Sequence, residues 1–197
     1  ERDPKDLGRF GLGLKTASFS QCRRVTVFTR QSKGALLTRC WDIDYIAETN
    51  EWRLLRCASR EAEAFTKKIA PLKHGTIVVW EKLDRLTEHT EVDNDADENA
   101  FLRRAEEVRE HFAAVFHRLM EGKGAVRFRL NGKVVAPWDP FLVNEPATQP
   151  LQVEKLPLLG SIIEVKPFVL PHLSKIQPEM HRAAAGKRGW NAHQGFY

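Results

Sequence analysis

Apolar and polar residues alternate along several short segments in the first half of the chain, which predicts a sheet. The segment 24–30 shows this alternation, and a turn at 32–34 separates it from a second predicted strand at 35–42, so the two form a hairpin. The run 74–80, His-Gly-Thr-Ile-Val-Val-Trp, is the strongest strand signal in the chain. We also expect a short strand at 51–57 and a short helix at 61–69.

Glycines precede the first of these strands. Residues 6–20 read Asp-Leu-Gly-Arg-Phe-Gly-Leu-Gly-Leu-Lys-Thr-Ala-Ser-Phe-Ser. Three glycines followed by good helix formers predict a flexible loop that becomes a helix at about residues 12–20.

The second half is predicted to open with a long helix. Residues 84–98 are acidic and poor in apolar residues, which is typical of an exposed linker. Beyond them, apolar residues recur at helical spacing between Asn99 and Met120, which predicts one amphipathic helix. These apolar residues are Phe101, Leu102, Ala105, Val108, Phe112, Val115, Phe116 and Leu119.

Strands are expected again after this helix. Asn131-Gly132 stands between the apolar runs 125–130 and 133–136, and this dipeptide is the strongest short signal for a hairpin. Two prolines end the sheet at 137–140. Further strands are predicted at 151–156 and 161–170, followed by an irregular helical connection at 171–185. The expected class is α+β, with helices packed on one face of mainly antiparallel sheets.

Composition narrows the class of protein. The 197 residues are 42% hydrophobic and 29% charged, as in an ordinary globular domain, and no apolar run approaches the roughly 20 residues of a membrane-spanning helix. Residues 1–6 lack the apolar core of a signal peptide. Cys22, Cys40 and Cys57 have no metal-ligand spacing, so we expect reduced thiols, a cytoplasmic location and no metal bound by this chain.

Charge is distributed unevenly. The net charge is +5, with eight Lys/Arg against three acids in residues 1–34 and eleven acids against five Lys/Arg in residues 81–110. A modest basic excess permits contact with nucleic acid, although a solvated surface is the simpler interpretation.

The glycine-rich loop is the first candidate for chemistry. Glycines let the backbone approach phosphate oxygens closely, and a helix start offers free N–H groups. Lys15, in the first turn, adds a positive charge for the β- or γ-phosphate. The spacing differs from that of a P-loop and of a dinucleotide-binding fingerprint, and a tight turn before a packed helix is the alternative interpretation.

Two other pairs of residues bear on function. Gly75-Thr76 stands at the head of the predicted strand 74–80, where the threonine hydroxyl can bind a buried carboxylate or a water near a base. Asp42 and Asp44 resemble paired carboxylates, but with no partner acid or base in view we expect them to be exposed strand residues.

The order of the motifs resembles a known superfamily. Gly-Arg-Phe-Gly-Leu-Gly-Leu-Lys-Thr-Ala-Ser, then Arg-Arg-Val-Thr-Val-Phe-Thr-Arg, then His-Gly-Thr-Ile-Val about sixty residues later, is similar to the third and fourth motifs of the GHKL ATPases. These include gyrase, the large heat-shock chaperone, histidine kinases and MutL. The glycine-rich segment 8–18 and the downstream Leu-Asn-Gly-Lys and Pro-Trp-Asp-Pro-Phe-Leu stretches resemble the prokaryotic MORC-like and MutL-like branch.

The resemblance implies a fold and a site. Residues 1–90 would be the lid and the C-terminal half of a Bergerat-type ATP-binding sandwich, 91–98 an acidic linker, and 99–197 a transducer domain with a ribosomal-protein-like fold. In the family the lid closes over ATP and Mg²⁺ and the Gly-Thr threonine supports the adenine pocket. By position, these roles fall to Gly8, Arg9, Phe10, Gly11, Leu12, Gly13, Lys15 and Thr76.

Departures from the family pattern are equally informative. The first motif, with its general-base glutamate and Mg²⁺-binding asparagine, and the second, Asp-x-Gly-x-Gly, are not found, so no general base, metal ligand or adenine reader is assigned. Lys187 is the nearest candidate for the transducer's phosphate-sensing lysine, and a solvated basic loop is its alternative. We therefore expect the 197-residue chain by itself neither to bind ATP tightly nor to hydrolyse it.

The resemblance implies an ATP-gated dimer clamp, in which ATP binding brings two copies together and hydrolysis releases them. Work on DNA in repair, restriction or defence follows from family analogy alone. The alternatives are a chaperone-like member acting on proteins and a non-catalytic interaction module. A large exposed apolar patch on the transducer would favour the chaperone, and a basic stripe would favour DNA.

Overall fold

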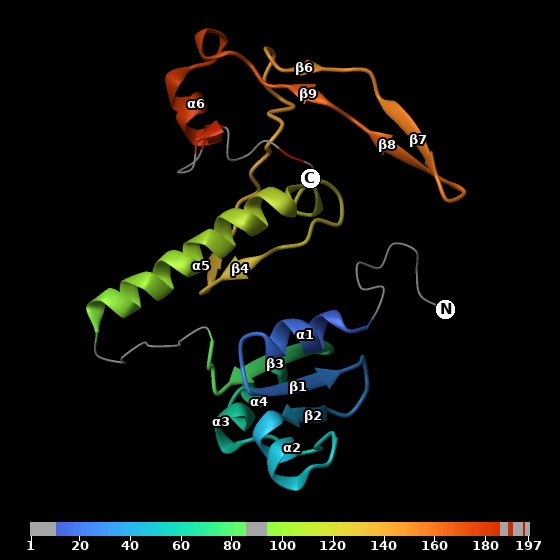
Figure 1. Ribbon diagram of the computed structural model, residues 1–197, viewed down its shortest axis with the longest axis vertical. Coiled ribbons are helices and arrows are strands. Elements are labelled where there is room, and N and C mark those ends of the chain that lie inside the picture. Colours follow the sequence, from blue (N-terminus) through green and yellow to red (C-terminus); the bar gives the residue numbers. More distant parts are fainter. Residues whose placement is uncertain (1–10, 86–93, 186–188, 191–194, 196–197) are drawn as a thin grey trace. The chain divides into compact units, whose positions relative to one another are not determined.

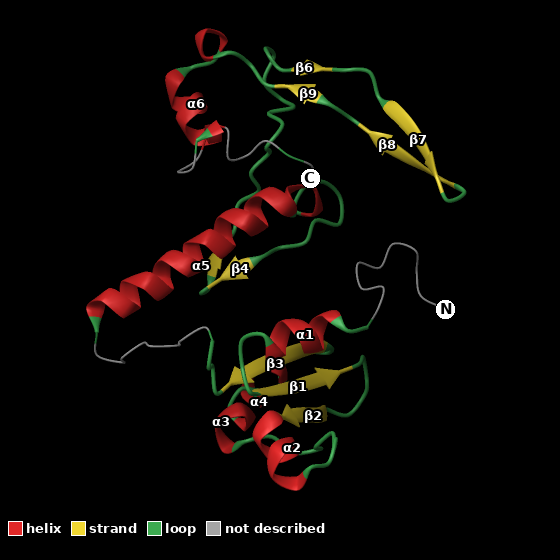
Figure 2. Ribbon diagram, viewed as in Figure 1, coloured by secondary structure: helices red, strands yellow, loops and turns green. Residues whose placement is uncertain are grey.

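The computed structural model describes residues 11–85, 94–185, 189, 190 and 195, and divides the chain into two compact units, 1–97 and 98–197 (Figure 1). Helices and strands occur in both units, in agreement with the predicted α+β class (Figure 2). No helix in the described part of the chain has the length and apolar composition needed to cross a bilayer. Each unit is described by itself below.

A three-stranded antiparallel sheet forms the centre of the first unit. Its strands are β1 (Arg24–Arg30), β2 (Leu37–Asp42) and β3 (Gly75–Glu81), in the order β2-β1-β3. The predicted hairpin and the predicted third strand are thereby confirmed. Because side chains alternate between the faces of a strand, even-numbered and odd-numbered residues of β1 lie on opposite faces.

One face of this sheet forms the core of the unit. Thr26 and Phe28 of β1 are almost completely buried there, and Cys40 is their neighbour on β2. The covering helices α3 (Arg60–Glu63) and α4 (Thr66–Ile69) contribute Ala62 and Ile69, which are both fully buried. The single helix predicted at 61–69 is therefore two short helices.

The other face of the sheet carries α1 (Gly13–Phe19), which the sequence predicted within one residue at each end. Helices therefore pack on both faces of this sheet, and the prediction that they pack on one face is wrong here. Trp80 of β3 donates a hydrogen bond from its Nε1 to Ser18 Oγ at 2.9 Å, and Ser18 is fully buried. This contact fixes the C-terminal end of α1 against the sheet.

Two further predictions in this unit are wrong. A third helix, α2 (Ile43–Thr49), begins directly after β2, because Asp42 accepts a hydrogen bond from the Asp44 backbone N–H (3.0 Å) and so caps the helix. Asp42 and Asp44 are therefore not two exposed strand residues. The segment 51–57 is not a strand either: within the described part of the chain its only ladder contact is an isolated bridge from Leu55 to Cys40.

The second unit is built on a long helix, α5 (Asp95–Val115), followed by a short 3-10 turn, η1 (His117–Leu119). The predicted acidic linker ends earlier than expected, because Asn94 accepts from the Ala96 backbone N–H (2.9 Å) and starts the helix. Acidic residues in the first turn are favoured by the helix dipole. An aromatic cluster of Phe112, Phe116 and Phe128 packs on the last turns of α5, with centroid distances of 5.5–5.6 Å.

The remaining strands of this unit are all antiparallel pairs. The predicted Asn131-Gly132 hairpin is confirmed as β4 (Arg129–Leu130) and β5 (Lys133–Val134), with positive φ at both turn residues. The predicted strands near 151–170 form two further pairs, followed by irregular and helical segments as expected. Their bounds are β6 (Gln149–Pro150), β7 (Glu154–Leu158), β8 (Ser161–Val165), β9 (Phe168–Val169), η2 (Leu173–Lys175) and α6 (Pro178–Ala185).

Candidate functional site

The predicted lid leads directly into α1. Gly8, Arg9 and Phe10 lie outside the described residues. Gly11 has a φ of +69°, a conformation that glycine adopts without strain. Gly13 opens the helix, and a Cβ added there would meet no heavy atom of the described residues within 4 Å. The backbone at the start of α1 is therefore accessible to a ligand from outside.

The first turn of α1 has features that suit an anion. Leu12, at the N-cap, supplies no side-chain cap, and no acidic residue lies in the first turn. The first N–H groups of a helix have no partner within the helix and carry its positive dipole end. Lys15 is half-buried and forms no ion pair with the described residues. Free amides and a free lysine at one helix end can contact phosphate oxygens.

The opposite end of α1 is held firmly. Besides the bond from Trp80, the Ser18 carbonyl accepts the Cys22 backbone N–H at 2.9 Å, which turns the chain into β1. Cys22 is fully buried in this turn, and burial raises the pKa of its thiol. The lid helix thus has a fixed C-terminal end and an open N-terminal end.

Thr76 lies on the same face of the sheet as α1. It is four residues before Trp80 on β3, an even spacing that places both side chains on one face. Its hydroxyl is 2.9 Å from the Thr29 hydroxyl and is exposed. Because α1 ends where β1 begins, the helix runs back along β1 and its open end faces toward the Thr76 end of the sheet (Figure 1). The two predicted parts of the site therefore share one surface.

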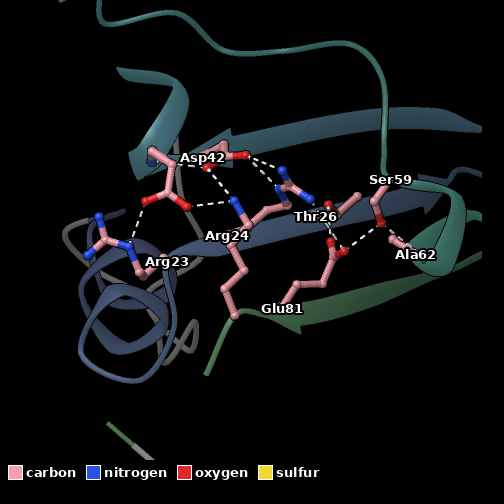
Figure 3. Close-up of polar contacts among 9 residues, drawn as sticks. Arg23, Arg24, Thr26, Asp42, Ser59, Ala62 and Glu81 are labelled. Atoms are coloured by element: carbon pink, nitrogen blue, oxygen red, sulfur yellow. Dashed lines mark hydrogen bonds and ion pairs between the residues drawn. The ribbon is translucent and has the colours of Figure 1, made fainter. Parts of the chain in front are cut away.

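A polar cluster that the sequence did not predict lies on the other face (Figure 3). Arg24 is flanked across the sheet by Asp42 on β2 and Glu81 on β3. Its Nε donates to Asp42 Oδ2 at 2.6 Å, and its Nη1 lies 3.8 Å from Glu81 Oε1. Burial acts to lower the pKa of Arg24, but the hydrogen bond to Asp42 and its charge outweigh burial and raise it.

The cluster continues to the covering helices. Glu81 accepts hydrogen bonds from Thr26 Oγ1 (3.3 Å) and from Ser59 Oγ (2.5 Å). Ser59 in turn caps α3 by accepting the Ala62 backbone N–H at 2.9 Å. Glu81 is thereby tied to the sheet and to α3.

A second, more exposed group lies beside it. The Asp44 carboxylate accepts hydrogen bonds from Lys82 Nζ at 2.6 Å and from Arg23 Nε at 2.7 Å. These hydrogen bonds, the one from Lys82 first, lower the pKa of the Asp44 carboxyl. Because the carboxylates of both groups are paired with cations, the arrangement stabilises the fold and offers no free acid or base.

The sequence did contain a signal for this cluster. Arg24, Asp42 and Glu81 stand at the ends of three strands, and an antiparallel order β2-β1-β3 brings those ends together. That order is set by long-range pairing, so the cluster can be recognised only once the strand order is known.

Metal ligands and a phosphate-sensing lysine are the remaining questions about the site. Within the described residues, no group of three or more His, Cys, Asp or Glu side chains is placed to hold a metal ion. Lys187, the candidate for the sensor, lies outside the residues that the structure describes.

Comparison with known proteins supports the family resemblance for the first part of the chain. Residues 1–76 match the family model described as histidine kinase-, DNA gyrase B-, and HSP90-like ATPase. This segment includes the lid and ends at Thr76, and the match supports the GHKL superfamily for it. No curated protein and no solved structure matches the chain.

Proposed function

We propose that this chain carries the nucleotide lid and part of the ATP-binding domain of a GHKL-type ATPase that works as an ATP-gated dimer clamp. One observation carries the proposal. Within the segment that matches the family, the open end of α1 and Thr76 share one face of the sheet. If the lid contacts the phosphates and Thr76 supports the adenine pocket, as the resemblance implies, both groups have to lie on the surface that receives the nucleotide.

Different residues would contact the phosphate end and the adenine end of ATP. The backbone of Gly8–Gly13 and the ammonium group of Lys15 would contact the phosphates, and Thr76 would support the adenine pocket. ATP, bound with Mg²⁺, supplies a γ-phosphate whose loss on hydrolysis changes what the lid holds. We assign no general base and no Mg²⁺ ligand to a residue of this chain.

The lid would act as an order–disorder switch. Trp80 and Ser18 hold one end of α1 in place, so only the glycine-rich end has to move when phosphate contacts form or break. We propose residues 1–90 as the ATPase part, 91–98 as a linker and 99–197 as a transducer domain of the MORC-like or MutL-like type that passes this change to a second copy. Three free thiols, two of them buried, support a cytoplasmic location.

DNA is the client that we propose, in repair, restriction or defence. Arg127, Arg129 and Lys133, on and beside the β4–β5 hairpin, are exposed and form no ion pair with the described residues. A lysine or arginine that neutralises a DNA phosphate releases bound counterions. Loss of one such contact should therefore reduce the slope of log affinity against log salt concentration by about one. A protein client is the second candidate, because β7 and β8 expose a run of large aliphatic residues.

ATP turnover tests the proposal. In the protein that contains this chain, Lys15→Ala should weaken ATP binding about 10- to 100-fold, the effect of losing one charged hydrogen bond. Lys67→Ala removes an exposed lysine from α4, on the other face of the sheet, and should leave binding unchanged. Equal ATP affinity and turnover in wild type and Lys15→Ala would refute the assigned lid.

A further inference from the structure

Thr76 has a hydroxyl partner directly across the sheet. Thr29 of β1 and Thr76 of β3 are opposite each other in the antiparallel register, so both side chains lie on the face that carries α1. Their Oγ1 atoms are 2.9 Å apart, a normal length for a hydrogen bond between two hydroxyls. Thr29 is half-buried, whereas Thr76 is exposed. A ligand that contacts the Thr76 hydroxyl therefore meets a group that is already bonded to Thr29.

The two hydroxyls are isolated from other polar side chains on the neighbouring strands. On the other side of Thr29, the residue that faces it on β2 is Leu37. One row further along β1 and β3, the same face carries Val27 and Val78, which also face each other. Among these described neighbours on the sheet, Thr76 alone offers Thr29 a polar side chain.

Thr29 also contacts the backbone of the Gly-Thr motif. Its Oγ1 donates to the Gly75 carbonyl oxygen in a long hydrogen bond of 3.4 Å. Gly75 has a φ of +154°, which a residue with a side chain rarely adopts, so the position of this carbonyl depends on glycine. A hydroxyl has one proton, and a carbonyl oxygen can only accept. Because the Thr29 proton is directed to Gly75, the bond between the two hydroxyls uses the proton of Thr76.

The resulting chain of hydrogen bonds runs from Thr76 to Thr29 to Gly75 and fixes the direction of the Thr76 hydroxyl. A hydroxyl without such a partner rotates to suit either a donor or an acceptor. The Thr76 proton is instead engaged between the strands, so its oxygen presents free lone pairs on the exposed side. A fixed acceptor at this position suits an N–H donor and repels a carbonyl oxygen.

We infer that Thr29 is a positioning residue of the nucleotide site, which acts through Thr76 and favours adenine over guanine. Thr29 holds Thr76 as a hydrogen-bond acceptor, and the amino group on C6 of adenine is a matching donor. Guanine carries a carbonyl oxygen at C6, which finds no donor in a fixed Thr76. This inference rests on the proposed function, because it needs the base of the nucleotide to lie at Thr76.

A purely structural pair is the alternative, because cross-strand threonine pairs also stabilise sheets that bind no ligand. Two features favour the positioning role. The pair includes the threonine of the Gly-Thr motif, and it is bonded to the carbonyl of the motif's glycine. A structural pair would affect the binding of every nucleotide equally, whereas a positioning pair changes the ratio of ATP affinity to GTP affinity.

Substitution of Thr29 by valine tests this role. In the protein that contains this chain, Thr29→Val keeps the branched shape that suits a strand but removes the hydroxyl. Thr76 is then free to rotate and loses its fixed direction. Isothermal titration calorimetry with Mg²⁺ should show ATP affinity lowered about 3- to 10-fold, the effect of one neutral hydrogen bond, and GTP affinity unchanged. The preference for ATP over GTP should fall by the same factor.

Two further variants separate the hydroxyl from its surroundings. Thr29→Ser retains a hydroxyl and should restore the ATP affinity of the wild type. Thr38→Val is the matched control, because Thr38 is also half-buried and belongs to β2 of the same sheet. It faces Phe28 and so lies on the other face, and its substitution should change neither affinity.

A double-mutant cycle tests whether Thr29 acts through Thr76. Thr76→Val should lower ATP affinity at least as much as Thr29→Val does. In a Thr76→Val background, Thr29→Val should then have no further effect, because the group that it positions is gone. Independent losses that simply add would contradict the inference.

The outcomes distinguish this inference from the proposed function. Lower ATP affinity in Thr29→Val that is rescued by serine supports the inference. If Thr76→Val weakens ATP binding but Thr29→Val does not, the inference is overturned and the proposed function stands. The same holds if Thr29→Val weakens ATP and GTP binding equally. If neither Thr76→Val nor Lys15→Ala weakens ATP binding, the proposed function fails and the inference fails with it.

Discussion

Each unit of the chain contains an ion pair between residues that face each other across antiparallel strands. In residues 1–97, Arg24 of β1 faces Asp42 of β2, and in residues 98–197, Lys155 of β7 faces Glu164 of β8. The Asp42 side chain is 6% exposed and that of Arg24 26%, whereas Lys155 and Glu164 are 66% and 47% exposed. Both pairs occupy facing positions of neighbouring strands, but they differ in burial and in distance, which is 2.6 Å from Arg24 Nε to Asp42 Oδ2 and 3.6 Å from Lys155 Nζ to Glu164 Oε1.

This difference shows where each unit obtains its stability. The first unit places a charged cluster against its own core, so its sheet is secured from within by Asp42, Glu81 and Ser59. The β7–β8 hairpin has exposed charges at its base and exposed aliphatic residues toward its tip, so it has no comparable buried support among the described residues. Water screens the second pair and barely reaches the first.

Removal of Asp42 should have the largest effect. Asp42→Ala leaves the partly buried Arg24 without its carboxylate and removes the cap of α2, so we expect a loss of about 3 kcal/mol in the free energy of unfolding. Urea titration followed by tryptophan fluorescence measures it. A loss below about 1 kcal/mol would show that the buried pair behaves like an exposed one, and that burial does not distinguish it from the pair in the second unit.

Loss of the indole contact to the lid helix should be smaller. Trp80→Phe keeps an aromatic ring but leaves the buried Ser18 hydroxyl without its donor, which we expect to cost about 1–2 kcal/mol. Amide hydrogen exchange should become faster in α1. Trp52→Phe, at a 69% exposed tryptophan, is the control and should change neither quantity.

Some elements of the first unit could be predicted from the sequence, and others could not. Strands β1 and β3 and helix α1 follow from local alternation and helix-forming residues, and their bounds were predicted to within a residue. The predicted strand at 51–57 was wrong because only Leu55 finds a partner, at Cys40, and pairing is a long-range property. Helix α2 was missed because Asp42 belongs to a strand and to a helix cap at once.

The candidate site was predictable only in part. Glycines, Lys15 and Thr76 are visible as motifs, and the structure adds that Thr76 and α1 share a face. The Arg24 cluster depends on which strands become neighbours, and no local pattern contains that information. The transducer assignment of residues 99–197 stays a prediction.

Acid should weaken the first unit through Asp44. Hydrogen bonds from Lys82 and Arg23 lower its pKa in the folded state, so its contribution is complete above the unfolded pKa of about 3.9 and is lost as the pH falls through the lower folded value. Asp44→Asn should therefore flatten the dependence of unfolding free energy on pH below about 4 and have little effect on that slope near pH 7. Unchanged acid sensitivity in Asp44→Asn would contradict the assignment.

The smallest effect is expected for the exposed ion pair of the β7–β8 hairpin. A double-mutant cycle of Lys155→Ala and Glu164→Ala isolates their interaction, which should be about 0.5 kcal/mol or less and should fall further in high salt. A coupling as large as the effect of Asp42→Ala would mean that this pair of the β7–β8 hairpin is buried in solution, because only removal from water makes the interaction of two facing charges that strong.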